Sequence, residues 1–140
     1  MILAADIGGT TCKLGIFDPS LKLIEKWQIP TDTTDEGGNI LKDIHVSFKD
    51  KLRVHNLSYE DFTGAGIGVP GPVDFEAGVV NGAINLNWYA HKDIKKDFEV
   101  LSGMPTIVDN DANLATLGEQ AFGAGPVSYT HLTLPTTPYV

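Results

Sequence analysis

The sequence has little cysteine, few basic side chains and no long apolar run. Its one cysteine, Cys12, excludes an internal disulfide and a cysteine-rich zinc site within this chain. No stretch of about eighteen apolar residues is present that could span a membrane. The first ten residues also lack the basic start and the cleavage pattern of a signal peptide. We therefore expect a protein of the reducing cytoplasm with no membrane partner.

Basic residues are too few to suggest nucleic-acid binding. Eighteen Asp and Glu residues oppose ten Lys and Arg residues, which gives a formal net charge of -8 at pH 7. Such a chain repels a phosphate backbone unless its basic residues cluster. The densest basic group, Lys92, Lys95 and Lys96, is expected on a solvated helix face. With 42% hydrophobic and 20% charged residues among 140, the chain is expected to form one globular domain.

The apolar pattern predicts an α/β fold, in which flanking helices cover a mixed sheet. Short apolar runs between turn residues predict an antiparallel meander of three strands, at residues 2–5, 14–17 and 21–29. Apolar residues at helical spacing then predict a helix over residues 36–55. The remaining predicted elements are strands at 64–69 and 106–109, a hairpin at 73–75 and 79–80, and helices at 92–102 and 112–122.

A polar loop with two glycines directly follows the first predicted strand, where Asp6 precedes Gly8, Gly9, Thr10 and Thr11. Glycines let backbone N–H groups approach an anion and the threonines add hydroxyl donors, so the loop suits phosphate. It differs from a P-loop because it has no lysine at the required place and leads into a strand. A carboxylate here could face phosphates across a magnesium ion. The alternative is a plain hairpin turn, in which the carboxylate accepts bonds from the next N–H groups.

Polar residues also occupy the predicted strand-to-helix junction at residues 108–113, VDNDAN. Asp111 is a candidate base that removes a proton from a sugar hydroxyl during phosphoryl transfer, and Asn110 could bond an adjacent hydroxyl. The alternative is that Asn110 or Asp111 only caps the helix. Asp109 is expected to be structural.

Two other segments carry weaker signals. Residues 68–74, GVPGPVD, predict a rigid loop at a strand's carboxyl end, where ligands bind in open α/β sheets, although a plain turn is the alternative. In NLNW, Asn85 could bond sugar hydroxyls and Trp88 could stack on a sugar. The four histidines have no ligand-like spacing and are expected at the surface, and Cys12 is expected to be a small buried residue.

Together, the motifs resemble one family in their order and spacing: the ROK family of sugar kinases and repressors, and within it the bacterial glucokinases. The matching segments are DIGGT at 6–10, GVPGPVD at 68–74, NLNW at 85–88 and VDNDAN at 108–113. The resemblance covers residues 1–125. It implies an actin-like ATPase, ribonuclease-H-like fold that binds ATP and a sugar between two domains, with this chain forming the N-terminal domain.

The resemblance also implies roles for individual residues. Asp111 would be the catalytic base, Asn110 a sugar ligand, and Asp6 a residue at the Mg²⁺ ion, directly or through water. Gly71 and Asn85 would lie near the sugar. The first phosphate loop would consist of Gly8, Gly9, Thr10 and Thr11.

The chain departs from the family pattern after residue 125. It lacks the second glycine-rich phosphate loop, the Glu-x-Gly-His sugar motif and the cysteine-rich motif, so a structural zinc is expected only in the missing C-terminal half. Residues 126–140 contain no Asp, Glu, Lys or Arg and resemble a translated adaptor, which predicts a non-native tail. Half a cleft cannot position both substrates, so we expect this fragment to be inactive. Family dimer contacts lie largely in the absent half, which leaves a homodimer open for the full-length protein.

The favoured function is ATP-dependent phosphorylation of a hexose, most simply glucose at its C6 hydroxyl. A sugar-sensing repressor of the same family is the alternative, but its DNA-binding module would precede the first strand, where Met1 already stands. A ribonuclease-H-like nuclease could hold two metals on Asp6 and Asp111, yet the glycine-threonine loop has no role there. These motifs leave the identity of the hexose open.

Overall fold

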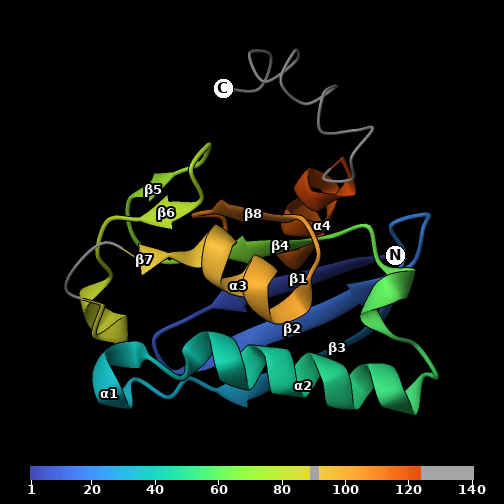
Figure 1. The fold of residues 1–140 in the computed structure, drawn as a ribbon, viewed down its shortest axis with the longest axis horizontal. Coiled ribbons are helices and arrows are strands. Elements are labelled where there is room, and N and C mark those ends of the chain that lie inside the picture. The colour runs from blue at the N-terminus through green and yellow to red at the C-terminus, as the bar shows by residue number, and fades with distance from the viewer. Residues whose placement is uncertain (89–91, 124–140) are drawn as a thin grey trace.

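The computed structural model describes residues 1–88 and 92–123, which form a five-stranded sheet and a small three-stranded sheet (Figure 1). The predicted tail at 126–140 lies outside the described residues. The large sheet has the order β3-β2-β1-β4-β8, in which β1, β2 and β3 are antiparallel and β1, β4 and β8 are parallel. Its strands are β1 (Ile2–Ile7), β2 (Thr11–Phe17), β3 (Leu23–Pro30), β4 (Gly64–Gly68) and β8 (Thr106–Asp109). The predicted mixed sheet with an N-terminal meander is therefore present.

Helices cover both faces of this sheet. Successive side chains of β1 point to opposite faces and therefore pack in two separate hydrophobic cores. Leu3 and Ala5 pack with residues of α2 (Ile40–Val54) and α3 (Ile94–Ser102), whereas Ile2 and Ala4 pack with α4 (Leu114–Phe122). The small sheet consists of β5 (Val73–Asp74), β6 (Val79–Val80) and β7 (Lys92–Asp93). No helix in 1–88 or 92–123 is long and apolar enough to cross a membrane.

Three predicted helix starts were wrong, because turn geometry, strand pairing or a capping residue overrides apolar spacing there. The helix expected at 36–55 begins at Ile40, since the preceding turn α1 (Thr34–Gly37) has left-handed backbone at Asp35 and Glu36. The helix expected at 92–102 begins at Ile94, because residues 92–93 pair with β6. The helix expected at 112–122 begins at Leu114, after its cap.

The contact between β4 and α4 depends on glycine. A Cβ at Gly66 would lie 2.3 Å from the carbonyl oxygen of Leu117, and a Cβ at Gly68 would lie 2.2 Å from that of Asp111. Both distances are far below van der Waals contact, so only glycine lets the α4 backbone and the loop before it rest directly on the strand. These glycines set how close α4 lies to the sheet.

We expect Gly66→Ala to lower the free energy of unfolding by about 3 kcal/mol, because the new methyl group would force two backbones apart. Gly15→Ala on β2 is the matched control. A Cβ there would make ordinary 3.4 Å contacts with the ends of two leucine side chains, so its unfolding free energy should stay the same or rise. Urea titration of both variants provides the measurement. Equal losses in the two variants would contradict the close-packing explanation.

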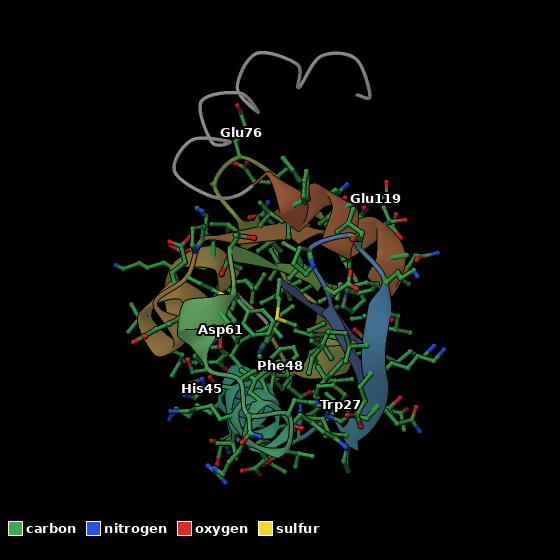
Figure 2. All side chains as sticks on the ribbon, turned by 90° about the vertical axis from the view of Figure 1, so that its right-hand side faces the viewer. Trp27, His45, Phe48, Asp61, Glu76 and Glu119 are labelled. Carbon is green, nitrogen blue, oxygen red and sulfur yellow. The ribbon has the colours of Figure 1, made fainter. Side chains whose placement is uncertain are left out.

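A polar cluster joins β3 to α2. The Glu25 carboxylate accepts bonds from Lys51 Nζ at 2.8 Å and His55 Nε2 at 2.6 Å. Lys51 Nζ also lies 5.3 Å from the centre of the Trp27 ring, and this ring packs edge-to-face with that of Phe48. Figure 2 labels both aromatic residues. Hydrogen bonds from Lys51 and then from His55 lower the pKa of Glu25 below its ordinary 4.5. This cluster holds β3 against the helix that covers it.

Two histidines differ from the sequence prediction. His55 and His45 are half-buried rather than on the open surface, and His45 stacks on Tyr59. The other two, at positions 91 and 131, lie outside the described residues.

The Glu25 cluster predicts a pH-dependent stability. Because its pKa is lower in the folded chain, ionised Glu25 stabilises the fold above pH 4.5, and this contribution disappears as pH falls through the lowered pKa. Glu25→Gln should therefore unfold at lower urea concentration than the wild type at pH 7, and the difference should shrink as pH falls toward 3. Asp50→Asn, which removes the exposed pair with Arg53, should change little at either pH.

Candidate functional site

The three parallel strands end at one edge of the sheet and bring the predicted loops together. Asp6 on β1 is in register with Gly68 on β4, which is in register with Asp109 on β8. In Figure 1, β4 and β8 point toward the same side of the molecule, where the small sheet lies. The loops that follow β1, β4 and β8 therefore meet at the carboxyl ends of the strands. In open α/β sheets, ligands bind at this edge.

The loop between β1 and β2 presents free backbone donors. Gly8 N donates to the Thr11 carbonyl at 3.0 Å and closes the turn. Gly9 and Thr10 are exposed, and their amides donate to no residue of 1–88 or 92–123. Asp6 likewise accepts no hydrogen bond from a described residue, which contradicts the alternative in which its carboxylate serves only to cap this turn. Free amides beside a free carboxylate can hold a phosphate and a cation.

Asp6 and Asp111, far apart in the sequence, interact at this edge. Burial raises the pKa of Asp6, Lys13 lowers it, and the negative charge of Asp111 raises it further. Lys13 is exposed on β2 in register with Asp6, and no sequence motif singled it out. The two carboxylates thus share one site, with a lysine beside them.

The loop after β8 holds Asp111 away from a capping role. Asn113 caps α4, because its side chain accepts from Ala115 N at 2.8 Å and Thr116 N at 3.3 Å. The alternative that placed the cap at Asn110 or Asp111 was therefore wrong. Asp111 Oδ1 accepts from Asn113 N at 2.8 Å, which orients the carboxylate and leaves its second oxygen without a described partner.

Other residues of the same loop take different positions. Asp109 Oδ1 accepts from Asn110 N at 2.7 Å, consistent with the structural role expected for Asp109. The Asn110 side chain is exposed and makes no hydrogen bond with a described residue. It is free to contact a ligand.

Asn85 contacts the loop between β1 and β2, and Gly71 contacts the segment that precedes Asn85. A Cβ at Gly9 would lie 3.1 Å from Asn85 Nδ2, so this exposed side chain rests on the loop. Gly71 has φ +132°, and a Cβ there would lie 2.7 Å from the Gly82 carbonyl, in the segment that leads to Asn85. The structure therefore places Asn85 against Gly9, and it packs Gly71 against the segment that leads to Asn85.

Trp88 does not play the predicted stacking role. Only 3% of it is exposed, and its Nε1 donates to the Gly37 carbonyl at 3.0 Å. The prediction that Trp88 stacks on a sugar was wrong, because the indole belongs to the core. The alternation of polar and apolar residues in NLNW was the available signal, since it places Trp88 on the buried side.

The side chains at this edge suit a Mg²⁺ ion bound mainly by water and substrate phosphates, and do not suit a metal ion bound by several protein side chains. No group of three His, Cys, Asp or Glu side chains in the described part of the chain could hold a metal ion. Asp6 offers one half-buried carboxylate without a described hydrogen-bond donor. Mg²⁺ is typically bound by one or two carboxylates, several waters and substrate phosphates, so Asp6 fits that mode.

A groove of about 720 Å³ adjoins the site between the β2–β3 ribbon and the start of α4. Lys13, Lys26 and Asn113 line its polar part, and Leu23 and Leu114 line its apolar part. Leu23 is 47% exposed.

The model of the ROK family matches residues 2–133. The chain therefore belongs to the ROK family, as the motifs predicted. The predicted mixed α/β fold class is also confirmed by the solved structures of this family.

The relatives include sugar kinases. The glucokinase of Halalkalibacterium halodurans is 37% identical over 123 residues, which are 88% of this chain and 37% of that protein. The structure of the Streptomyces griseus ROK family glucokinase in complex with glucose and AMPPNP matches with a TM-score of 0.66 and 32% identity, over 88% of this chain and 37% of that one. The chain thus spans 37% of the length of these relatives.

A ROK family transcriptional regulator, a homologue of the E. coli MLC protein, matches with a TM-score of 0.59 and 17% identity over 77% of this chain and 27% of that one. At that identity the likeness shows the fold alone. The fold is therefore common to a kinase and a regulator.

The interaction between the two carboxylates can be measured directly. Asp111→Asn should lower the pKa of Asp6 toward its ordinary 3.8, while burial keeps the pKa above that value. Asp109→Asn is the matched control, since it lies two strands from Asp6, about 10 Å away. Carbon-13 NMR titration of the Asp6 carboxyl gives both values. An unchanged pKa in Asp111→Asn would show that the two carboxylates do not interact.

Proposed function

We propose that residues 1–125 are the N-terminal domain of an ATP-dependent hexose kinase, which transfers a phosphoryl group to the C6 hydroxyl of glucose. One observation carries the proposal: Asp111 lies within electrostatic reach of Asp6, beside a loop whose Gly9 and Thr10 amides have no described partner. A carboxylate that can accept a hydroxyl proton thus lies near backbone amides that can bind phosphate. These are the parts that phosphoryl transfer requires.

In the proposed reaction, Asp111 accepts the proton of the sugar hydroxyl as the hydroxyl oxygen bonds to the γ-phosphorus of ATP, and the bond from that phosphorus to the leaving oxygen of ADP breaks. The bond from Asn113 N holds one oxygen of this carboxylate, so the other can face the hydroxyl. The exposed amides of Asn110 and Asn85 would bond neighbouring hydroxyls, with Gly71 nearby. These bonds would hold the reacting hydroxyl in line with the phosphate, and such orientation raises the rate of phosphoryl transfer.

The phosphates of ATP would bind the loop of Gly8, Gly9, Thr10 and Thr11 through the Gly9 and Thr10 amides, which donate to no described residue, and through the threonine hydroxyls. Asp6 would hold Mg²⁺, directly or through water, and the bound ion would neutralise negative charge on the phosphates. The AMPPNP complex of the Streptomyces griseus glucokinase supports a nucleotide as donor. The zinc expected in the family lies, by this proposal, in the part of the protein beyond this chain.

The same proposal makes the 140-residue chain inactive alone. One domain supplies the base and the first phosphate loop, but the sugar and nucleotide sites of the longer relatives need the remaining length. A half-cleft neither aligns two substrates nor excludes water.

The test uses residues 1–125 joined to the C-terminal part of the Halalkalibacterium halodurans glucokinase, assayed for glucose phosphorylation with MgATP. We expect turnover in this completed protein and a loss of at least about 100-fold in kcat for Asp111→Asn. Asp109→Asn keeps the oxygen that accepts from Asn110 N, so it should lose less than tenfold.

Full turnover in Asp111→Asn would overturn the assignment of the base. A completed protein that binds glucose tightly but never phosphorylates it would favour a sugar sensor, the alternative that the shared fold permits.

A further inference from the structure

Thr31, the residue after β3, holds two carbonyl groups of the phosphate loop. Its backbone N donates to the Thr10 carbonyl at 2.9 Å, and its Oγ1 donates to the Gly8 carbonyl at 2.7 Å. Cys12 Sγ lies 3.3 Å from the same Oγ1. Because a hydroxyl has one hydrogen and Gly8 accepts it, the Cys12 thiol must donate to Thr31. Thr31 is therefore bonded to three residues in and beside the loop.

These bonds determine where the loop's donors point. The Gly8 carbonyl and the Gly9 N–H belong to one trans peptide unit and point in opposite directions. When Thr31 fixes the carbonyl on its own side, the Gly9 N–H must face the other side. This amide donates to no described residue and lies in an exposed part of the loop. Thr31 thereby turns a backbone donor outward.

The segment after Thr31 is itself anchored. Asn87 Nδ2 donates to the Thr33 carbonyl at 2.7 Å, and Trp88 Nε1 donates to the Gly37 carbonyl at 3.0 Å. A Cβ at Gly37 would lie 2.4 Å from Trp88 Nε1, so the indole rests tightly on this turn. The buried end of NLNW thus holds the segment that carries Thr31.

We propose that Thr31 is a positioning residue for the phosphate loop: by holding the Gly8 and Thr10 carbonyls, it aims the Gly9 amide at the phosphate of the donor. The identity of the ligand rests on the proposed function. The clamp itself rests only on the hydrogen bonds, so the two can be tested separately.

The first experiment tests the clamp in the 140-residue chain. Thr31→Val keeps the shape and the backbone N–H but removes the hydroxyl, whereas Thr31→Ser keeps the hydroxyl. We expect Thr31→Val to speed hydrogen exchange of the Gly8 amide, which closes the turn, by about five- to tenfold, and Thr31→Ser to restore it. Thr63→Val, which removes a bond to the Met1 carbonyl, is the matched control and should leave Gly8 unchanged.

Amides of β1 serve as an internal check, because exchange there should stay slow in every variant that remains folded. An unchanged Gly8 exchange rate in Thr31→Val, with the fold intact, would overturn the clamp.

The second experiment uses the completed protein described above and separates binding from turnover. Thr31→Val should raise KM for MgATP about five- to tenfold and leave KM for glucose unchanged, and Thr31→Ser should recover the wild-type value. A general loss of structure would instead change both constants together. If Gly8 exchange rises but KM for MgATP stays the same, the clamp exists without a role in phosphate binding, and the proposal fails.

Absence of any kinase activity in the completed wild-type protein would count against the proposed function. In that case MgATP titration of its Gly9 amide resonance decides the inference: a shift that Thr31→Val weakens supports it, and no shift overturns it.

Discussion

The close contact of β4 with α4 and its preceding loop is the constraint on which the candidate site depends. Gly66 and Gly68 place no side chain between the strand and the carbonyls of Leu117 and Asp111. The backbone of β4 can then contact the backbone of α4 and of the loop after β8 directly. In this position the negative charge of the Asp111 carboxylate is close enough to raise the pKa of Asp6. A side chain at either glycine would push the loop after β8 or α4 away from β4.

The loops at this edge are also braced against one another. Thr31 holds the loop after β1, and Trp88 holds the turn that follows Thr31. Asn85, three residues before Trp88, rests on Gly9. One motif therefore contributes both an exposed amide to the site and a buried indole to its support. The left-handed backbone at Asp35 and Glu36 lies within this braced turn, where tertiary contacts can hold a conformation that is costly locally.

Apolar spacing was sufficient to predict the meander, the small hairpin and three helices, because the two faces of each element are a local property of the chain. It failed at helix ends, where distant partners decide: β7 exists only because it pairs with β6. At the candidate site, the sequence predicted Asp6, Asn110 and Asp111 because polar residues follow strands there, and it predicted Asn85 because an amide beside a tryptophan can bind a sugar. The structure brings Asp6 within electrostatic reach of Asp111 and Asn85 against Gly9. Thr31 was missed because a single threonine in a polar stretch matches no pattern. The prediction for Trp88 was wrong because it did not use the alternation of polar and apolar residues in NLNW, which places the indole on the buried side.

The sequence by itself determined the family, the alternation of elements and the residue types at the ends of the parallel strands. Only the tertiary structure decided which of these residues meet. Asp6 and Asp111 are 105 residues apart in the sequence. They become neighbours through the strand order β1-β4-β8 and the glycine contact that brings the loop after β8 against β4. Periodicity and motifs are local properties that a sequence carries directly. Register, burial and close approach arise when remote segments pack, so they belong to the folded chain.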